Sequence, residues 1–389
     1  DINRVIRHKT EKKIYRITTH TGTVDATEDH SLLDSNHRIV KPTEVDIGTS
    51  LLHNYPNFSP CPITLKDMTN YSNTINEKSM KEKRAYIYGF FYGDGSCGKY
   101  DSKYGKKYSW AMNNKNYKLC SIIQHLCMEV FDSNFTINNT LESSGVYKVV
   151  PKGSIKYFVD LFSSMCYSDN YKVIPVEFMN DEYICRFAYL AGYYAANGKN
   201  QTTNIVLSNK GKIGSSMLYY MFKSIGLNVS INTRKDKMDI YKLTITKDKQ
   251  RQNPTQIKKI DFIKTIKDDY VYDIETVTGN FNTGFSLIVK NTDSVFIDFA
   301  PKDKEGKLMT GKEGLKRAID LGVEAEKYVQ QFLKPPHKLE YEKTFWPFIL
   351  FSKKRYIGYK YEFDIENYSE TSMGIVLKRR DNANIVKHA

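Results

Sequence analysis

The sequence contains no long apolar run and no paired-cysteine motif, and its acidic residues are outnumbered by basic ones. No stretch approaches the roughly 20 apolar residues of a membrane-spanning helix, and no signal peptide opens the chain, so a membrane or secreted protein is not expected. Because the six cysteines form no C-x-x-C pair, a zinc site is a poor fit, and free thiols in a reducing intracellular compartment are favoured. The formal net charge of +14 indicates a polyanionic partner, with nucleic acid first and an anionic membrane surface second.

A nine-residue phrase occurs twice, as IYGFFYGDG at residues 87–95 and as LAGYYAANG at residues 190–198. Each copy is followed by further landmarks in the same order, namely Asn114-Lys115 and Tyr147-Lys148 after the first, and Asn209-Lys210 and Tyr241-Lys242 after the second. The chain therefore contains an internal duplication, and each copy predicts helix, strands, helix, strands.

Both phrases are apolar on nearly all sides, which predicts buried helices. Gly89 and Gly192 weaken a helix by roughly 1 kcal/mol relative to alanine, so we expect them where two backbones approach closely. Such a helix pair would bring Asp94 and Asn197 together at one end, near a pseudo-twofold axis. The predicted strands alternate and carry lysine, arginine, asparagine and threonine on their exposed faces, which suits contact with DNA.

The paired phrase resembles the motif of the LAGLIDADG (DOD-type) homing endonucleases. This resemblance implies two αββαββα-like halves joined through the paired helices, with sheets that read a long double-stranded DNA site. It implies that Asp94 is a catalytic acid that binds Mg²⁺ and that Asn197 occupies the second metal-binding position. Lys148 and Lys242 fall where strand lysines of that family approach the active site.

Asn197 departs from the family pattern, since an amide oxygen can coordinate Mg²⁺ but contributes no charge. We therefore expect weak cleavage, nicking of one strand, or no cleavage. The alternative interpretation is a DNA-binding module without nuclease activity, carried by an insert that still splices.

The segments on either side of the duplication, TGTVDATEDHSLL at 21–33 and VYDIETVTGNFNTGFSLIVKN at 271–291, together resemble the all-β Hedgehog/intein splicing domain. The resemblance implies that Thr27 and His30 polarise the upstream peptide and that Asp273 couples the steps of the reaction. It also implies that Asn291 cyclises and that the Thr292 hydroxyl accepts the acyl chain.

Two positions differ from the usual splicing pattern, because Lys290 and Gly279 stand where histidines are common. A third interpretation is therefore a polymerase interrupted by an insert that no longer splices. Since the chain starts at Asp1 with His30 already near, we expect the start of the splicing domain and its nucleophile in a missing upstream segment.

The sequence TDSVFIDF that follows Asn291, with KLEYEKTFWPFILFSKKRYIGYK at 338–360 and GIVLKRRDN at 374–382, resembles family B DNA polymerases, especially the delta-like enzymes of eukaryotes and large DNA viruses. The resemblance makes Asp293 a metal-binding acid of the palm. It also implies contacts of basic and tyrosine side chains with primer-template DNA. The implied DNA-binding residues are Lys353, Lys354, Arg355, Tyr356, Arg379 and Arg380. An amphipathic helix is predicted at 311–333.

The expected fold is an α+β multidomain chain, in which an all-β splicing domain is interrupted by a pseudo-twofold endonuclease and followed by a polymerase palm and the start of the thumb. The expected function is a fragment of a DNA-directed DNA polymerase that contains a splicing insert with an embedded endonuclease. Its partners would be target DNA, primer-template and dNTPs, with Mg²⁺ for both nucleic-acid reactions, in the nucleus or a cytoplasmic viral factory and not on a membrane. The predicted boundaries are 1–55 and 257–291 (splicing), 56–80 (linker), 81–250 (endonuclease, with repeats at about 81–170 and 171–250) and 292–389 (polymerase).

Overall fold

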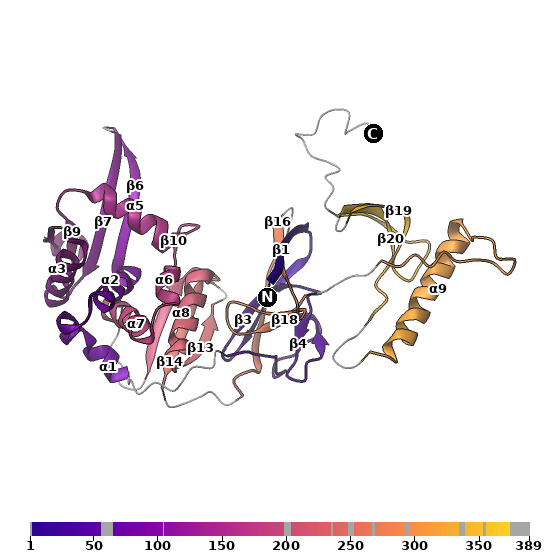
Figure 1. Ribbon diagram of the computed structural model, residues 1–389, viewed down its shortest axis with the longest axis horizontal. Helices are drawn as coiled ribbons and strands as arrows, with labels where there is room; N and C mark the ends of the chain where they lie inside the picture. The colour runs from indigo at the N-terminus through magenta and orange to yellow at the C-terminus, as the bar shows by residue number, and fades with distance from the viewer. Residues whose placement is uncertain are drawn as a thin grey trace. The chain divides into compact units, whose positions relative to one another are not determined.

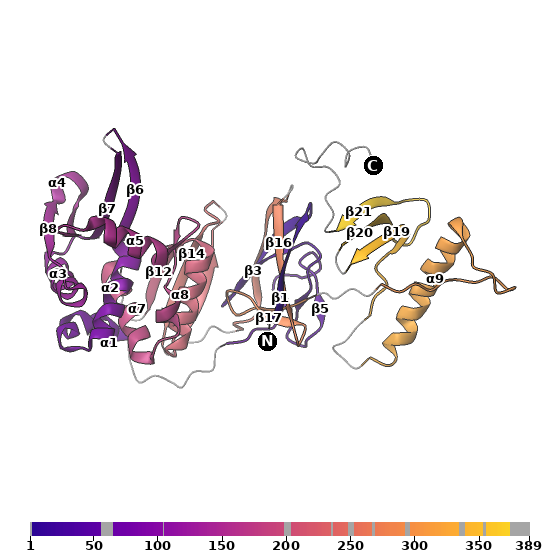
Figure 2. The same ribbon diagram turned by 45° about the horizontal axis from the view of Figure 1, so that its top comes forward.

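The computed structural model describes most of the chain as a mixture of helices and small sheets (Figures 1 and 2). The described residues are 2–55, 65–103, 105–197, 204–234, 236–247, 253–266, 269–291, 296–333, 339–352 and 355–373. They divide into a larger unit, 13–265 with 280–290, and a smaller unit, 1–12 with 266–279 and 291–389. Among the described residues, no helix is both long and apolar enough to cross a membrane.

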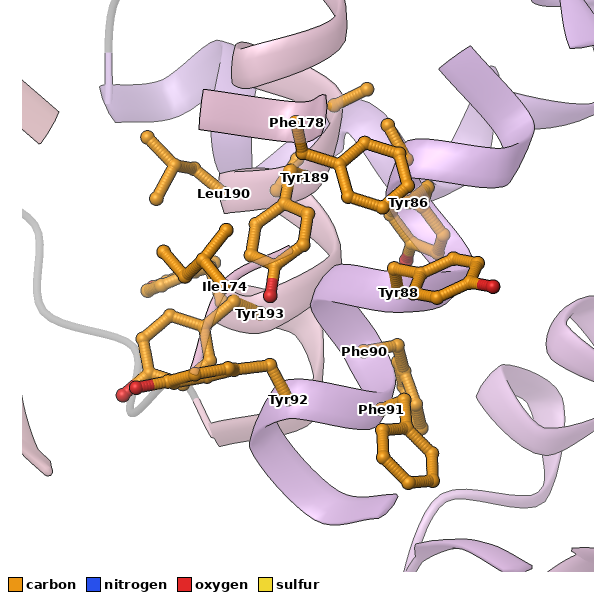
Figure 3. Close-up of a cluster of buried hydrophobic side chains, with 14 of the residues drawn as sticks. Tyr86, Tyr88, Phe90, Phe91, Tyr92, Ile174, Phe178, Tyr189, Leu190 and Tyr193 are labelled. Carbon is orange, nitrogen blue, oxygen red and sulfur yellow. The ribbon is translucent and has the colours of Figure 1, made fainter. Parts of the chain in front are cut away.

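Two helices, α2 (Met80–Asp94) and α7 (Tyr183–Asn197), pack against each other in the larger unit. A capping box starts α2, in which Ser79 and Glu82 satisfy each other's backbone N–H groups. Both helices are buried along most of their length, and their aromatic side chains meet in the shared core that Figure 3 shows. The prediction of two buried, paired helices is confirmed.

Each copy of the repeat builds one sheet covered by helices. The first copy comprises β6 (Gly95–Ser102), β7 (Gly105–Asn114), α3 (Tyr117–Phe131), β8 (Phe135–Thr140), α4 (Leu141–Ser144), β9 (Val146–Pro151) and α5 (Ile155–Cys166). The second comprises β12 (Ile205–Lys210), α8 (Lys212–Ser224), β13 (Asn228–Thr233) and β14 (Ile240–Thr246). The strand orders are β6-β7-β9-β8 and β12-β14-β13. With α2 the first half is αββαββα as predicted, whereas the described part of the second half is αβαββ.

The predicted linker at 56–80 is helical over its second part. This part forms α1 (Leu65–Asn70) and two short 3₁₀ helices, η1 (Tyr71–Asn73) and η2 (Ile75–Glu77). Met68, Tyr71 and Ile75 are buried at helical spacing, and the Tyr71 hydroxyl donates to Glu82 at 2.8 Å. The asparagine and serine content suggested a loop, but these apolar residues pack the segment onto the paired helices.

The larger unit also contains small all-β layers. One sheet has the order β15 (Ile257–Thr265), β2 (Lys13–Thr19), β3 (Thr23–Thr27), and another has the order β17 (Asn280–Asn282), β18 (Ile288–Lys290), β4 (Leu32–Leu33), β5 (Ile39–Val40). A separate core that includes Ile17, Leu32 and Val289 holds them together. Two short elements connect the halves of the duplication, the ribbon β10 (Tyr167–Ser168) with β11 (Tyr171–Lys172), and α6 (Val176–Met179).

The smaller unit contains an isolated two-stranded ribbon, β1 (Ile2–Thr10) with β16 (Asp269–Thr276), and a helix with three strands. These are α9 (Gly311–Gln330), β19 (Thr344–Ser352), β20 (Arg355–Tyr361) and β21 (Ser369–Met373), with strand order β19-β20-β21. The helix expected at 311–333 is confirmed, and Leu315 and Ile319 pack it against Tyr361. The predicted splicing segments are divided between the two units, because β1 and β16 pair with each other in a sheet of their own.

Candidate nuclease and splicing sites

The paired helices approach so closely that their glycines cannot carry side chains. A Cβ atom added to Gly89 would lie 1.9 Å from the carbonyl oxygen of Tyr189. A Cβ atom added to Gly192 would lie 2.1 Å from the carbonyl oxygen of Tyr86. The expectation that these glycines mark a close backbone approach is therefore confirmed.

The same packing brings the two helix C-termini together. A Cβ atom on Gly93 would lie 2.6 Å from the Cβ atom of Ala196 and 3.1 Å from the Nδ2 atom of Asn197. Asp94 follows Gly93 directly, so the carboxylate and the Asn197 amide share one end of the helix pair. Asp94 is half-buried and Asn197 is exposed.

Two asparagines at the end of β7 hold Asp94 in place. The Nδ2 atom of Asn113 donates to the Asp94 carbonyl oxygen at 2.8 Å. The Nδ2 atom of Asn114 lies 3.4 Å from the Asp94 carboxylate and 3.5 Å from the carbonyl oxygen of Ala196, so it bridges the two helices. Burial raises the pKa of Asp94, although Lys172 and Asn114 both act to lower it.

Lys172 was not among the residues that the sequence singled out. Its Nζ atom donates to the carbonyl oxygens of Phe91 and Tyr92, both at 3.0 Å, and of Gly93 at 3.3 Å. The ammonium therefore satisfies the negative C-terminal end of α2. Burial lowers the pKa of Lys172 to about 8, and Asp94 acts in the opposite direction.

The two lysines that the sequence did single out lie on the middle strands of the two sheets. Lys148 on β9 is half-buried and stands opposite Asn113, the residue that bonds the end of α2. Lys242 on β14 is exposed and stands opposite Ser208. The lysine whose charge acts on the Asp94 carboxylate is Lys172, so the catalytic roles of Lys148 and Lys242 stay predictions.

The oxygen atoms at the paired helix ends suit a hard cation in chemical type. Asp94 supplies one carboxylate, and Asn197 adds an amide oxygen without charge. The described residues contain no group of three or more His, Cys, Asp or Glu side chains arranged to hold a metal ion. Because Mg²⁺ is commonly held by one or two carboxylates together with water and phosphate oxygens, this donor set fits a single ion shared with a nucleic-acid phosphate.

The residues expected to polarise the upstream peptide lie in the larger unit. Thr27 ends β3, and the backbone N–H of His30 donates to the Thr27 carbonyl oxygen at 3.0 Å, forming a tight turn. Both side chains are half-buried. The next residue, Ser31, accepts a hydrogen bond at 3.0 Å from the backbone N–H of Lys290.

The other two predicted splicing residues that the structure describes lie in the smaller unit. The side chain of Asn291 is buried, and its Nδ2 atom donates to the carbonyl oxygen of Ile274 at 3.2 Å. Asp273 precedes Ile274 on β16, and its carboxylate accepts the Ile274 N–H at 2.9 Å. The backbone N–H of Asn291 donates to the carbonyl oxygen of Gly279 at 2.7 Å, so Gly279 contributes its main chain where a histidine side chain is common.

Most of the predicted polymerase residues lie outside the described residues. This group comprises Thr292, Asp293, Lys353, Lys354, Arg379 and Arg380, while Arg355 is described only as the first residue of β20. The ring of Tyr356 is buried, with ring centroids 5.1 Å from Phe296, 5.5 Å from Phe345 and 5.4 Å from Phe348. Its ring packs against phenylalanines of β19 and of the segment before α9, so the structure gives no support to a DNA contact through this side chain.

Several solved structures share a likeness with part of the chain at low overall scores. A variant of the homing endonuclease I-DmoI is 18% identical, covers 43% of this chain and 86% of its own, and gives a TM-score of 0.34. I-DmoI in complex with DNA and Ca is 17% identical, with a TM-score of 0.34 and coverage of 43% and 85%. The N-terminal LAGLIDADG domain of DUF199/WhiA is 14% identical, with a TM-score of 0.30 and coverage of 49% and 89%.

Sequence comparison shows similarity to viral DNA polymerases. The DNA polymerase of Acanthamoeba polyphaga mimivirus is 46% identical over 396 residues, which is 99% of this chain and 22% of that protein. The DNA polymerase of Pyramimonas orientalis virus is 54% identical over 106 residues, 27% of this chain and 9% of that protein. The chain thus spans less than a quarter of the length of these curated relatives. The family model for DNA polymerase family B matches residues 256–389, a range that includes the predicted splicing segment 257–291.

Proposed function

We propose that this chain is a piece of a family B DNA polymerase interrupted by a protein-splicing insert that carries a homing-endonuclease-like module. The observation that carries the proposal is the position of Asn291. Its side-chain amide is buried against the strand that bears Asp273, and polymerase-like sequence follows it directly. The likeness to a giant-virus polymerase over 99% of the chain supports the same interpretation.

Cyclisation of Asn291 would release the insert from the downstream polymerase segment. The side-chain nitrogen attacks the carbonyl carbon of the same residue, the Asn291–Thr292 peptide bond breaks, and the proton lost by the amide is balanced by one gained by the departing Thr292 amine. Before this step the Thr292 hydroxyl would attack the ester or thioester that links the upstream acyl chain to the side chain of the insert's first residue, and that side chain leaves as its hydroxyl or thiol, with Thr27 and His30 polarising the upstream peptide. After cyclisation the acyl chain would pass from the Thr292 oxygen to the freed Thr292 amine, which forms the peptide bond of the joined polymerase. The hydrogen bond from Nδ2 to the Ile274 carbonyl oxygen orients the attacking nitrogen.

The test is to express the chain with upstream polymerase sequence restored and to weigh the products by mass spectrometry. Joined polymerase and a free insert are the expected products. The matched control, Asn291→Ala, removes the attacking amide and should leave the downstream bond intact. An uncleaved wild-type precursor would contradict the proposal and would favour the interpretation that Lys290 and Gly279 mark a lost activity.

A second activity is favoured by the shared end of α2 and α7. We propose that this end binds one Mg²⁺ through Asp94 and a DNA phosphate, with Asn197 adding a neutral oxygen, and that Lys172 stabilises the negative charge nearby. One carboxylate where two are usual gives nicking or slow cleavage of double-stranded DNA. The sheets with Lys148 and Lys242 would lie along the DNA backbone.

Plasmid cleavage tests this second activity, with a supercoiled substrate that contains the uninterrupted polymerase gene and Mg²⁺ in the buffer. Asp94→Asn should abolish cleavage, and Asn197→Asp should raise the yield of linear product at least tenfold because it restores the second charge. Equal activity of wild type and Asp94→Asn would refute the assignment. DNA binding without cleavage in both wild type and Asn197→Asp would select the DNA-binding alternative.

The joined polymerase would add dNTPs to a primer-template by two-metal chemistry, with Asp293 as one Mg²⁺ ligand. The basic residues at 353–355 and 379–380 would contact the nucleic-acid backbone. The family match at 256–389 supports this part of the proposal.

A further inference from the structure

The loop that connects β17 to β18, residues 283–287, inserts an aromatic side chain into the core of the nuclease module. We call it the anchor loop. Phe285 is fully buried, with its ring stacked 5.4 Å from that of Tyr241 on β14 and edge-on to that of Tyr219 on α8 at 5.7 Å. The anchor loop belongs to the sequence of the predicted splicing domain, yet its central side chain is part of the other module's core.

Helix α8 also binds the main chain of the anchor loop. The Tyr220 hydroxyl donates to the carbonyl oxygen of Thr283 at 2.8 Å and accepts the N–H of Ser286 at 3.0 Å. The hydroxyl of Ser216 donates to the carbonyl oxygen of Gly284. Buried main-chain groups need such partners, so two side chains of α8 define the conformation of the loop.

The conformation of the anchor loop determines how the chain enters β18. Backbone hydrogen bonds run from Thr283 N to Leu287 O at 2.8 Å and from Ile288 N to Leu52 O at 3.0 Å. β18 then ends at Lys290, one residue before Asn291. A shift of one residue in such a short strand would turn every following side chain to the other face.

A second contact fixes the same modules together. Arg16 on β2 forms an ion pair with Asp25 at 2.7 Å, and it also donates to the Tyr241 hydroxyl at 2.9 Å and to the Met238 carbonyl oxygen at 2.6 Å. Lys212 at the start of α8 reaches Asp25 at 2.8 Å. The Arg16 side chain is buried, so its contacts with Tyr241 and Met238 hold β2 against the second half of the duplication.

We propose that helix α8 of the nuclease module positions the anchor loop for release at Asn291, with Tyr220 and Phe285 as positioning residues. The nuclease module is then required for splicing whether or not it cleaves DNA. This inference rests on the proposed splicing function. It gives a physical reason for keeping a nuclease-like module in which Asn197 replaces an acid, because loss of the module would also release the loop that leads to Asn291.

The experiment uses the full precursor with upstream polymerase sequence restored, and it measures upstream and downstream cleavage rates separately. Tyr220→Phe and Phe285→Leu should slow downstream release at least tenfold, while upstream cleavage and DNA binding by gel shift change less than twofold. Tyr194→Phe is the matched control, since its buried hydroxyl has no hydrogen-bond partner among the described residues, and it should release at the wild-type rate.

Each outcome decides a different point. A wild-type precursor that releases nothing would reject the proposed splicing function itself. Wild-type release with unchanged rates in Tyr220→Phe and Phe285→Leu would overturn the positioning role. If Tyr220→Phe and Phe285→Leu also lose DNA binding, the milder variant Ser216→Ala is measured instead. Severalfold slower downstream release by Ser216→Ala, with intact DNA binding, supports the inference, and release at the wild-type rate overturns it.

Discussion

Replacing Gly192 with alanine separates two opposed physical effects in the helix pair. Helix propensity alone favours alanine over glycine by about 1 kcal/mol in a helix interior. The structure predicts the opposite sign, because the new Cβ atom would lie 2.1 Å from the carbonyl oxygen of Tyr86 and 3.0 Å from the backbone nitrogen of Phe90. Main-chain atoms cannot rotate away, so the two helices would have to part.

The cost follows from what the helices share. Relieving the clash requires a separation of about 1 Å, and a gap of that size forfeits roughly a quarter to a half of each dispersion contact across it. Tyr86, Tyr189 and Tyr193 are fully buried along this seam. Overpacking of a dense core costs about 1–3 kcal/mol and occasionally more, and the backbone position of the clash puts Gly192→Ala at the upper end, about 3 kcal/mol of lost stability.

Urea unfolding, monitored by tryptophan fluorescence, measures the loss of stability in the larger structural unit. The chain has two tryptophans, of which Trp110 is buried in the larger unit and Trp346 is exposed in the smaller one. A Trp346→Phe background therefore makes the fluorescence specific to the larger unit. The free energy of unfolding is taken from the midpoint at unchanged slope.

Ala195→Gly on the same helix is the control, and it should lose only the propensity difference of about 1 kcal/mol. A Gly192→Ala variant that is more stable than its parent would refute the argument from close approach. It would mean that the seam has room for a methyl group.

Three further predictions concern buried titrating groups. Lys172→Met removes a positive charge that lowers the Asp94 pKa, so the pH profile of Mg²⁺-dependent plasmid nicking should move to higher pH and the rate should fall at least tenfold. Burial lowers the pKa of His53 from 6.5 to about 4. As the pH falls, the unfolded chain binds this proton before the folded chain does, so the free energy of unfolding should fall by about 3 kcal/mol between pH 6.5 and pH 4. In His53→Gln, urea unfolding should show a smaller loss of this free energy over the same pH range. Burial also lowers the pKa of Lys223 from 10.5 to about 8, and the Nζ atom lies 4.5 Å from the centroid of the Tyr55 ring. Lys223→Met should therefore raise the melting temperature at pH 7, with a gain that is full below pH 8 and fades between pH 8 and 10.5.

Because of the duplication, the pairing of α2 with α7 could be predicted from the sequence. Two matching phrases with glycine at the same place imply a common seam, and the structure places Gly89 and Gly192 there. The predicted helix pairing also placed Asp94 and Asn197 at the same end of the two helices, and this prediction did not depend on the arrangement of the sheets. Long-range contacts are rarely visible in one sequence, but here each copy of the repeat pointed to its partner.

The residues that were missed act through contacts that carry no local pattern. Lys172 belongs to a two-residue strand and reaches the end of a helix far back in the chain, so no spacing rule could connect them. Phe285 lies in a turn between short strands, where an aromatic residue looks exposed. Tyr356 was predicted from the sequence to contact DNA because it follows a basic run, whereas packing against Phe296 and Phe348 buries its ring.

The close packing of α2 against α7 also has a consequence for folding during protein synthesis. α2 leaves the ribosome on the order of 5–20 s before α7 at elongation rates of about 5–20 residues per second. During that interval the side of α2 that packs against α7, with Gly89 and Tyr92, has no partner helix to cover it, and a truncation between the helices would make this state permanent. Early protection by chaperones and synthesis at lower temperature should therefore raise the yield of folded chain more than any change at the surface.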